Sequence, residues 1–159
     1  MKHVTELIVV SEARQQILLG VKQRGFGRGK VVGFGGKLEA GETVTEGAAR
    51  ELHEETGLRV TPDQLDEVAV LTFHFPARPD WDHHIHVFLV HAWSGEPAGS
   101  EEITAEWHDL DAIPYDKMWD DARLWLPRIL AGERLQGTFI YADDNATVQE
   151  YEFTIAPSA

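Results

Sequence analysis

Short apolar runs, separated by polar turns, recur along most of the chain and predict β-strands. The first two runs are continuous apolar segments, which is typical of buried strands. In the last run, Tyr151, Phe153 and Ile155 alternate with more polar neighbours, which also favours a strand. The predicted strands cover residues 7–10, 16–21, 68–75, 85–93, 105–107, 138–141 and 148–155.

Two segments carry helix signals instead of strand signals. A capping box at residues 43–46 predicts the start of one helix, and Gly57 predicts its end. A second helix is predicted from the acidic pair at 120–121 to about Leu130, and Pro127 is expected to kink or shorten it. Strands, helix, strands, helix and strands in this order predict an α+β fold.

The composition narrows the class of protein. At 159 residues, the chain is predicted to form a single domain spanning residues 1–159. Its formal net charge of −13 argues against a basic surface that holds a nucleic-acid polymer, whereas a small phosphate substrate carried by a metal cation remains compatible. The chain has no cysteine, no apolar run long enough for a membrane span and no export signal, so we expect a cytoplasmic protein without disulfides.

Three glutamates gather on one face of the first predicted helix. Glu51, Glu54 and Glu55 have the i, i+3, i+4 spacing that places side chains in one sector. Like charges at this spacing destabilise a helix, so the cluster is either a solvated acidic face or a site for a hard divalent cation. The glycine-rich segment 33–36 allows the backbone to approach a ligand closely and a carbonyl to turn toward a metal.

The stretch from Gly36 to Leu58 carries a longer pattern of fixed residues. It matches the whole Nudix box, G-x5-E-x7-R-E-U-x-E-E-x-G-U with U aliphatic, at Gly36, Glu42, Arg50, Glu51, Leu52, Glu54, Glu55, Gly57 and Leu58. The chain therefore resembles the Nudix hydrolases. This resemblance implies an α/β/α sandwich around a mixed β-sheet, and hydrolysis of a nucleoside diphosphate linked to another group, with Mg2+ or Mn2+ as cofactor.

The same resemblance implies roles for the acidic residues. The expected metal ligands are the carbonyl of Gly35 and the side chains of Glu51, Glu54 and Glu55. Independently of the resemblance, Glu102 in a distant loop could complete the metal site or position water, or it could be a surface acid. A carboxylate would take the proton from the attacking water, and Glu54 is preferred for this role, with Glu102 next. Arg50 and Glu42 are expected to form an ion pair that fixes the loop against the helix.

Similarity outside the box narrows the expected substrate. Residues 18–37, residues 116–127 and the closing hairpin resemble the branch of Nudix hydrolases that acts on oxidised purine nucleoside triphosphates. The resemblance implies a nucleoside monophosphate and pyrophosphate as products, and an acidic residue that hydrogen-bonds the purine edge, here Asp121. The implied substrate-binding residues are Lys22, Phe26, Val32, Phe34, Phe73, Trp119 and Asp121.

Two positions depart from the pattern of that branch. The asparagine that reads the purine just before the glycine loop is Val32 here. The second aspartate of the pocket pair is Ala122, although Asp120 could compensate by a shift of one residue. A valine side chain neither donates nor accepts a hydrogen bond, so one contact to the base is lost, and losing such contacts weakens discrimination between bases.

Other functions stay open beside this one. The chain could be a Nudix hydrolase for ADP-ribose, a dinucleoside polyphosphate or an unmodified triphosphate. It could also be a catalytically silent sensor that binds a nucleotide or a protein, although the intact set of glutamates argues against this. In each enzymatic case the expected partner is a small nucleotide bound by a monomer, with no nucleic-acid polymer and no membrane.

A histidine cluster at residues 83–86 invites a second metal interpretation. His83, His84 and His86 could bind zinc, but adjacent strand residues point to opposite faces of a sheet. No cysteine accompanies the histidines, and no His-x3-His pair on a helix does either. The pattern therefore favours histidines that line a cleft over histidines that ligate a metal.

Overall fold

The computed structural model describes residues 1–155, so the last four residues of the predicted domain, 156–159, lie outside the described residues. The helices are α1 (Val44–Thr56) and α2 (Ala122–Leu130), and short 3-10 helices cover Pro62–Gln64, Pro79–Trp81 and Tyr115–Lys117. The strands are β1 (Lys2–Ser11), β2 (Gln16–Val21), β3 (Val31–Val32), β4 (Asp66–His74), β5 (His83–Val90), β6 (Glu106–Asp109), β7 (Leu135–Tyr141) and β8 (Val148–Ile155).

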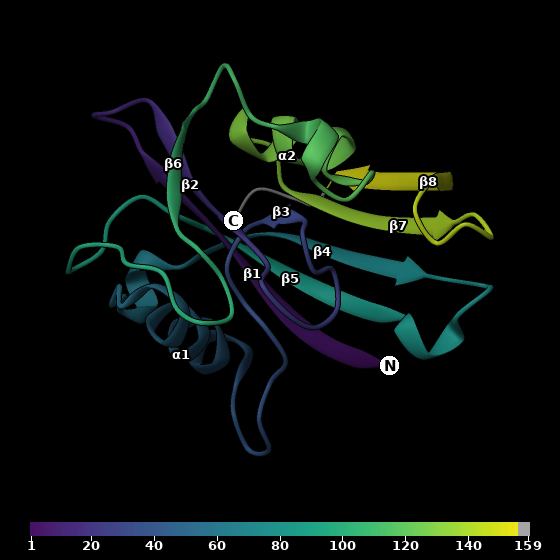
Figure 1. The fold of residues 1–159 in the computed structure, drawn as a ribbon, viewed down its shortest axis with the longest axis horizontal. Coiled ribbons are helices and arrows are strands. Elements are labelled where there is room, and N and C mark those ends of the chain that lie inside the picture. Colours follow the sequence, from purple (N-terminus) through teal and green to yellow (C-terminus); the bar gives the residue numbers. More distant parts are fainter. Residues whose placement is uncertain (156–159) are drawn as a thin grey trace.

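The strands form one mixed sheet between two helices (Figure 1). Its order is β3-β2-β1-β5-β4-β7-β8, and β6 pairs with β2 off this path. The pairs β1–β5 and β4–β7 are parallel, whereas the other pairs are antiparallel. One helix covers each face of the sheet, so the predicted α+β class and α/β/α sandwich are confirmed.

Two hydrophobic clusters hold the helices to the sheet. The even-numbered residues Ile8 and Val10 of β1 pack in the cluster beneath α2. The odd-numbered residues Leu7 and Val9 pack in the cluster beneath α1, because successive side chains of a strand point to opposite faces. All four side chains are almost fully buried, which explains why this strand has a continuous apolar run rather than an alternating pattern.

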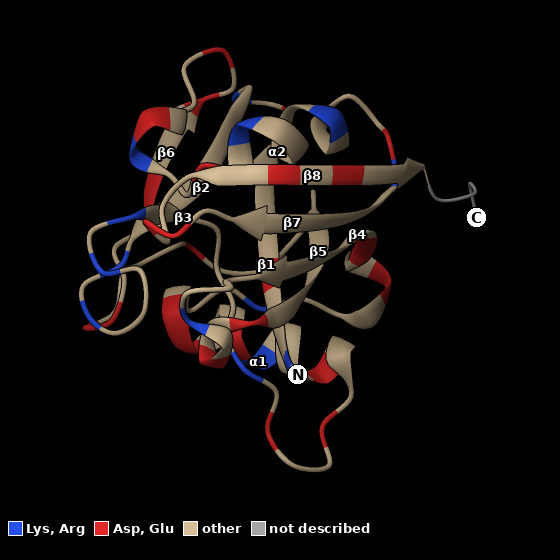
Figure 2. Cartoon of the chain, turned by 90° about the vertical axis from the view of Figure 1, so that its right-hand side faces the viewer, with Lys and Arg blue, Asp and Glu red and all other residues tan. Residues whose placement is uncertain are grey.

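Acidic side chains are spread over several elements of the structure. Figure 2 shows acidic segments on α1 and along β8. On β8, Glu150 and Glu152 are exposed. Among the described residues, no helix is long and apolar enough to cross a membrane.

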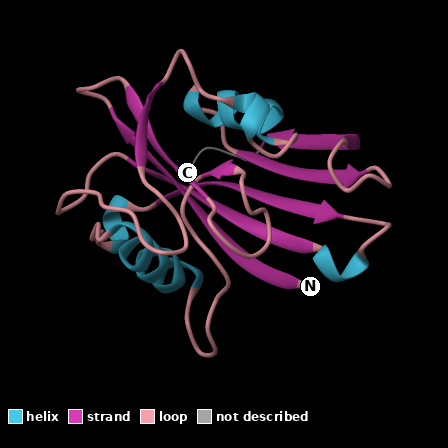
Figure 3. Cartoon of the chain, viewed as in Figure 1, coloured by secondary structure: helices cyan, strands magenta, loops and turns pink. Residues whose placement is uncertain are grey.

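The glycine-rich segment before α1 runs alongside β1. β1 pairs with β2 only at Val9–Ser11. Nearer its start, the amide of Thr5 donates to the carbonyl of Gly36 at 2.9 Å, and Leu7 pairs with Phe34. The segment then continues into the loop that leads to α1 (Figure 3). The sheet therefore holds the backbone of residues 34–36 in a fixed position next to the helix.

The ends of α1 form as the sequence predicts. The Thr43 hydroxyl accepts a hydrogen bond from the Glu46 amide at 3.1 Å, and the Glu46 carboxylate accepts one from the Thr43 amide at 3.2 Å. Gly57 ends the helix in the left-handed conformation, with φ of 79°, which a glycine adopts without a steric cost. The capping box and the glycine stop are both confirmed.

We expect Thr43→Ala to lower the free energy of unfolding by about 1 kcal/mol, because the Glu46 amide loses its acceptor at the start of α1. Urea denaturation monitored by circular dichroism measures this change. Thr43→Ser keeps the hydroxyl and serves as the control, with an unfolding free energy close to that of the wild type. Equal stability of the alanine variant and the wild type would contradict the capping role.

Several element boundaries differ from the predictions. β1 begins at Lys2 because its polar first half pairs in parallel with β5, which the apolar pattern does not reveal. The short strand β3 was not predicted. α2 contains Pro127 and still continues to Leu130. Asp121 precedes α2 but does not cap it, because its side chain is bonded elsewhere.

Candidate active site

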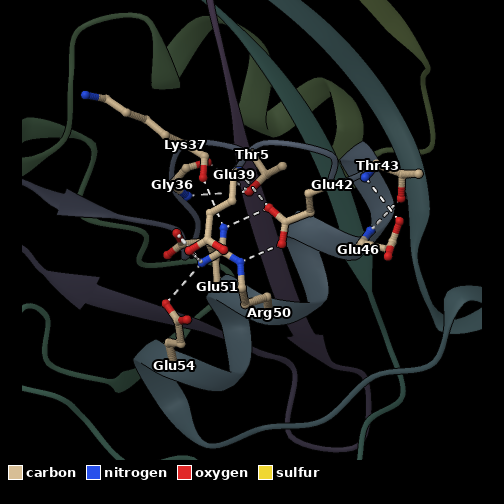
Figure 4. A network of polar contacts seen from close by, with 10 residues as sticks. All are labelled: Thr5, Gly36, Lys37, Glu39, Glu42, Thr43, Glu46, Arg50, Glu51 and Glu54. Carbon is tan, nitrogen blue, oxygen red and sulfur yellow. Dashed lines mark hydrogen bonds and ion pairs between the residues drawn. The ribbon is translucent and has the colours of Figure 1, made fainter.

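Arg50 is the centre of a polar network between α1 and the preceding loop (Figure 4). Its guanidinium contacts Glu42 twice, with Nε to Oε2 at 2.6 Å and a terminal nitrogen to Oε1 at 3.0 Å. It also donates to the Lys37 carbonyl at 3.1 Å, to Glu51 at 3.0 Å and to Glu54 at 3.2 Å. The expected Arg50–Glu42 ion pair is present, and it joins the loop to the helix.

The Glu42 carboxylate is held in its ionised form by this network. It accepts hydrogen bonds from Arg50 and from the Glu39 amide, which lower its pKa to about 2. The usual value for a glutamate is about 4.3. Glu42 therefore supports the loop as a permanent anion near neutral pH, and it is already paired before any ligand arrives.

Glu51 lies against the backbone of the glycine-rich segment. A Cβ atom added to Gly36 would lie 2.7 Å from the carboxylate carbon of Glu51, which is closer than real Cβ atoms approach a neighbour. Glycine at position 36 therefore lets this carboxylate sit directly on the loop. Burial raises the pKa of Glu51, and the charges of Glu54 and Glu102 add to the rise, whereas Arg50 opposes it.

Glu55 is the buried member of the three glutamates on α1. Its side chain accepts a hydrogen bond from the Gly35 amide at 2.8 Å, and it is only 5% exposed. Burial raises its pKa to about 7. A Cβ on Gly35 would lie 1.8 Å from the Thr5 carbonyl oxygen, so only glycine allows this loop to pack against β1.

Glu102 reaches the same region from a distant part of the chain. Its neighbour Ile103 forms a bridge with Lys22, and the Glu102 carbonyl accepts a hydrogen bond from the Gln23 amide at 2.8 Å. The Glu102 charge is close enough to raise the pKa values of both Glu51 and Glu55. The structure therefore brings Glu102 toward the carboxylates of α1, which favours a place in the site over an isolated surface acid.

The carboxylates suit a divalent cation in their chemistry but are not gathered around one point. Within residues 1–155, no three His, Asp or Glu side chains are arranged as metal ligands. Glu51 and Glu54 contact Arg50, and Glu55 contacts the Gly35 amide. Carboxylate oxygens are the ligands that hard cations prefer. Burial is the main cause of the raised pKa of Glu51, and a cation would offset the repulsion from Glu54 and Glu102 that adds to it. The donor set therefore fits such an ion.

A cavity of about 400 Å³ opens beside the carboxylates. The lining residues that it shares with the carboxylate region are Gly35, Gly36 and Glu55. Several aromatic side chains form part of its wall, and Phe26 stacks on Trp119 with ring centres 5.2 Å apart and planes 16° apart. Of the implied substrate-binding residues, the lining includes Lys22, Phe26, Val32, Phe73, Trp119 and Asp121.

Asp121 is fixed within the wall of this cavity. Its Oδ2 atom accepts a hydrogen bond from the Trp125 indole at 2.7 Å, and its Oδ1 atom accepts one from the Tyr141 hydroxyl. Burial raises the pKa of this carboxyl, whereas the two hydrogen bonds oppose the rise. The side chain links α2 to β7 and still faces the cavity.

Phe34 does not line the cavity, which corrects one sequence-based assignment. It is fully buried in the cluster beneath α1. Because side chains alternate along an extended segment, Gly33 and Gly35 face the cavity while Phe34 points to the other side. Phe34 therefore supports the packing of α1 and is not a substrate contact in this arrangement.

The structure also locates Asp120 and the clustered histidines relative to the cavity. Asp120 does not compensate for Ala122, because its carboxylate contacts Arg123 at 2.9 Å and accepts from the Val148 amide at 2.8 Å, outside the cavity lining. Of the three clustered histidines, all within the described residues, only His83 lines the cavity. His84 and His86 stack with His3 instead, on the opposite face of the sheet.

Several cavity residues were missed from the sequence. The lining also includes Glu6, Phe75, Trp81, Met118 and Tyr141. The sequence could have indicated Glu6, because it is an acid at a strand position on the same face as the apolar Ile8 and Val10. Trp81 comes from a 3-10 helix in a loop, for which the apolar pattern has no signal.

Known proteins resemble this chain over most of its length. The family model described as the NUDIX domain matches residues 1–129 of this chain. The chain is 40% identical over 148 residues to the oxidized purine nucleoside triphosphate hydrolase of Danio rerio, covering 93% of this chain and 92% of that protein. The protein of the same name from Mus musculus is 41% identical over 137 residues, covering 86% and 85%. The crystal structure of a MutT protein from Bacillus halodurans matches with a TM-score of 0.80 at 28% identity, covering 96% of this chain and 97% of that one. With the complete box on α1 and the mixed sheet between two helices, this chain belongs to the Nudix hydrolase family.

Proposed function

We propose that this protein hydrolyses oxidised purine nucleoside triphosphates, such as 8-oxo-dGTP, to the nucleoside monophosphate and pyrophosphate. This activity would remove damaged nucleotides from the pool used for nucleic-acid synthesis. Two relatives about 40% identical over most of the chain are named for this class of substrate, which supports the proposal. We expect the enzyme to act as a monomer in the cytoplasm on a small nucleotide.

One observation carries the proposal. A single cavity is lined both by the backbone and carboxylate of the Nudix box, at Gly35, Gly36 and Glu55, and by the aromatic rings of Phe26 and Trp119. A nucleotide is an amphipathic ligand with a flat base and a charged phosphate chain. The aromatic walls suit the base, and the carboxylate end suits phosphates that arrive with a cation.

Nudix hydrolases generally need a divalent metal ion, and we propose Mg2+, with Mn2+ as a substitute. The side chains of Glu51, Glu54 and Glu55 and the carbonyl of Gly35 would hold it, with Glu102 completing the set. When bound, the ion would neutralise charge on the phosphate oxygens and activate water. Arg50, which contacts Glu51 and Glu54, would position these carboxylates.

Glu54 is our candidate for the general base. Its side chain is 55% exposed, so water can reach it, and its one contact is the Arg50 ion pair at 3.2 Å. It would accept the proton of the water molecule that attacks a phosphorus of the triphosphate. Lys22, which also lines the cavity, would place a positive charge near the phosphates.

The apolar side chains of Val32 and Ala122 favour a second candidate function. Both line the cavity, and neither can hydrogen-bond the edge of a base. If Asp121 alone discriminated poorly between bases, the enzyme would also turn over unmodified triphosphates. This alternative keeps the same chemistry and changes only the preference for the base.

A substrate panel tests the proposed function. Turnover of 8-oxo-dGTP, 2-hydroxy-dATP, dGTP, ADP-ribose and diadenosine tetraphosphate is compared with Mg2+ present, by chromatography of the products. We expect the largest kcat/KM for an oxidised purine triphosphate, about tenfold or more above dGTP, since one well-placed hydrogen bond contributes this much. Equal or faster hydrolysis of dGTP would refute the sanitising function and leave the unmodified-triphosphate alternative.

A further inference from the structure

Glu6 is an acidic side chain on a strand face that is otherwise apolar. Val4, Glu6, Ile8 and Val10 of β1 share one face, since successive strand residues alternate. Ile8 and Val10 are buried in the cluster beneath α2, whereas Val4 and Glu6 line the cavity. The Glu6 carboxyl therefore points into the proposed nucleotide site and not into bulk solvent.

The Glu6 carboxyl has no hydrogen-bonding partner among residues 1–155, and the residue is half-buried in the cavity wall. Burial raises its pKa to about 8, and the nearby charge of Asp121 adds to the rise. Partial withdrawal of a polar group from water, with no hydrogen-bonding partner gained, does not favour the folded state. Glu6 therefore does not serve the stability of the fold, and its chemistry is free for a ligand.

The surroundings of Glu6 leave room for such a ligand contact. A Cβ on Gly33 would lie 3.0 Å from the Cγ atom of Glu6, so the glycine makes space for the acidic side chain. Both oxygens of Asp121, the other acid in this part of the cavity, already accept hydrogen bonds from the protein. The side chain of Val32 offers no polar atom.

We propose that Glu6 is a specificity-determining residue whose carboxyl hydrogen-bonds a polar edge of the purine base and supplies a contact that Val32 does not. This inference rests on the proposed function, because it takes a purine nucleotide as the occupant of the cavity. A neutral carboxyl group both donates and accepts hydrogen bonds. It therefore matches a base edge on which a carbonyl oxygen and an N–H lie side by side, as they do in guanine and its 8-oxo derivative.

The test compares Glu6→Leu and Glu6→Gln with the wild type. The nucleotides are 8-oxo-dGTP, dGTP and the deoxynucleoside triphosphate of unsubstituted purine, which has no exocyclic oxygen or amino group. Calorimetry with 8-oxo-dGMP adds a binding constant that does not depend on turnover. Glu12→Leu makes the same replacement at an exposed glutamate that follows β1, where the side chain is 77% exposed, and serves as the matched control.

We expect Glu6→Leu to lower kcat/KM for 8-oxo-dGTP and dGTP by about 10- to 100-fold, mainly through KM, and to weaken 8-oxo-dGMP binding equally. The unsubstituted purine nucleotide should lose less than about threefold. Glu6→Gln, which keeps a donor and an acceptor, should stay close to the wild type. The thermal midpoint of Glu6→Leu should equal or exceed that of the wild type, because an unpaired, half-buried carboxyl is removed.

Three outcomes would overturn the inference. These are unchanged kcat/KM values for 8-oxo-dGTP and dGTP in Glu6→Leu, an equal loss for all three nucleotides, and a loss in Glu6→Gln as large as that in Glu6→Leu. Failure of the proposed function looks different, since the wild type would then not prefer 8-oxo-dGTP to dGTP. In that case the effect of Glu6→Leu on dGTP and on 8-oxo-dGMP binding still decides the role of Glu6.

Discussion

Glu54→Gln is expected to lower kcat by about 100- to 10,000-fold, because a glutamine cannot take the proton from the attacking water. The fold should survive, since the Glu54 side chain is 55% exposed and its one contact is the ion pair with Arg50. An exposed pair of this kind contributes about 1 kcal/mol or less to stability. Steady-state release of pyrophosphate measures turnover, and thermal unfolding checks the fold.

The matched control is Glu46→Gln on the same helix. Glu46 belongs to the capping box, where glutamine can replace glutamate, so both turnover and stability should stay near wild-type values. Binding of Mn2+, followed by its paramagnetic signal, separates the two roles of Glu54. If Glu54 acts only as the base, Glu54→Gln leaves the Mn2+ affinity unchanged. If Glu54 is also a metal ligand, the substitution weakens Mn2+ binding. Undiminished turnover in Glu54→Gln would remove it as the base, and Glu102→Gln would then be the next variant to measure.

The catalytic helix could be predicted because its signals are local. Thr43 and Gly57 act on their own neighbours through backbone hydrogen bonds, so a short window of sequence contains the whole cause. The Arg50–Glu42 ion pair also joins residues close in sequence. The order of strands and helices was sufficient for the α+β class, because it limits how the elements can pack in layers.

The cavity could be predicted only in part because its walls come from distant segments. Asp121 is held by Tyr141, which lies 20 residues further along the chain on β7. Phe34 was assigned to the wrong side because the segment around it pairs with β1, and this pairing decides which of its side chains face the cavity. Glu6 differs from Phe34, because the sequence shows an acid on an apolar strand face but gives no reason for it. Only the structure shows that this face lines the cavity.

Breaking the buried contacts of Asp121 is expected to have the largest effect on stability. Asp121→Ala leaves the Trp125 indole and the Tyr141 hydroxyl without their acceptor, and each unsatisfied buried group costs about 1–3 kcal/mol. Asp121→Asn keeps the shape and an acceptor for Trp125, while the Tyr141 hydroxyl can accept from the new amide. The asparagine variant should therefore retain more of the unfolding free energy in urea.

The same two variants separate support of the fold from recognition of the base. If Asp121 hydrogen-bonds the purine edge, Asp121→Asn should lose much of the preference for 8-oxo-dGTP over dGTP while it stays folded, because its amide presents donors where the carboxylate only accepts. Asp120→Asn is the matched control, since Asp120 contacts Arg123 and β8 outside the cavity and should leave this preference unchanged. A stable Asp121→Asn variant with wild-type preference would limit Asp121 to joining α2 to β7. Base recognition would then have to come from Glu6 and the aromatic walls.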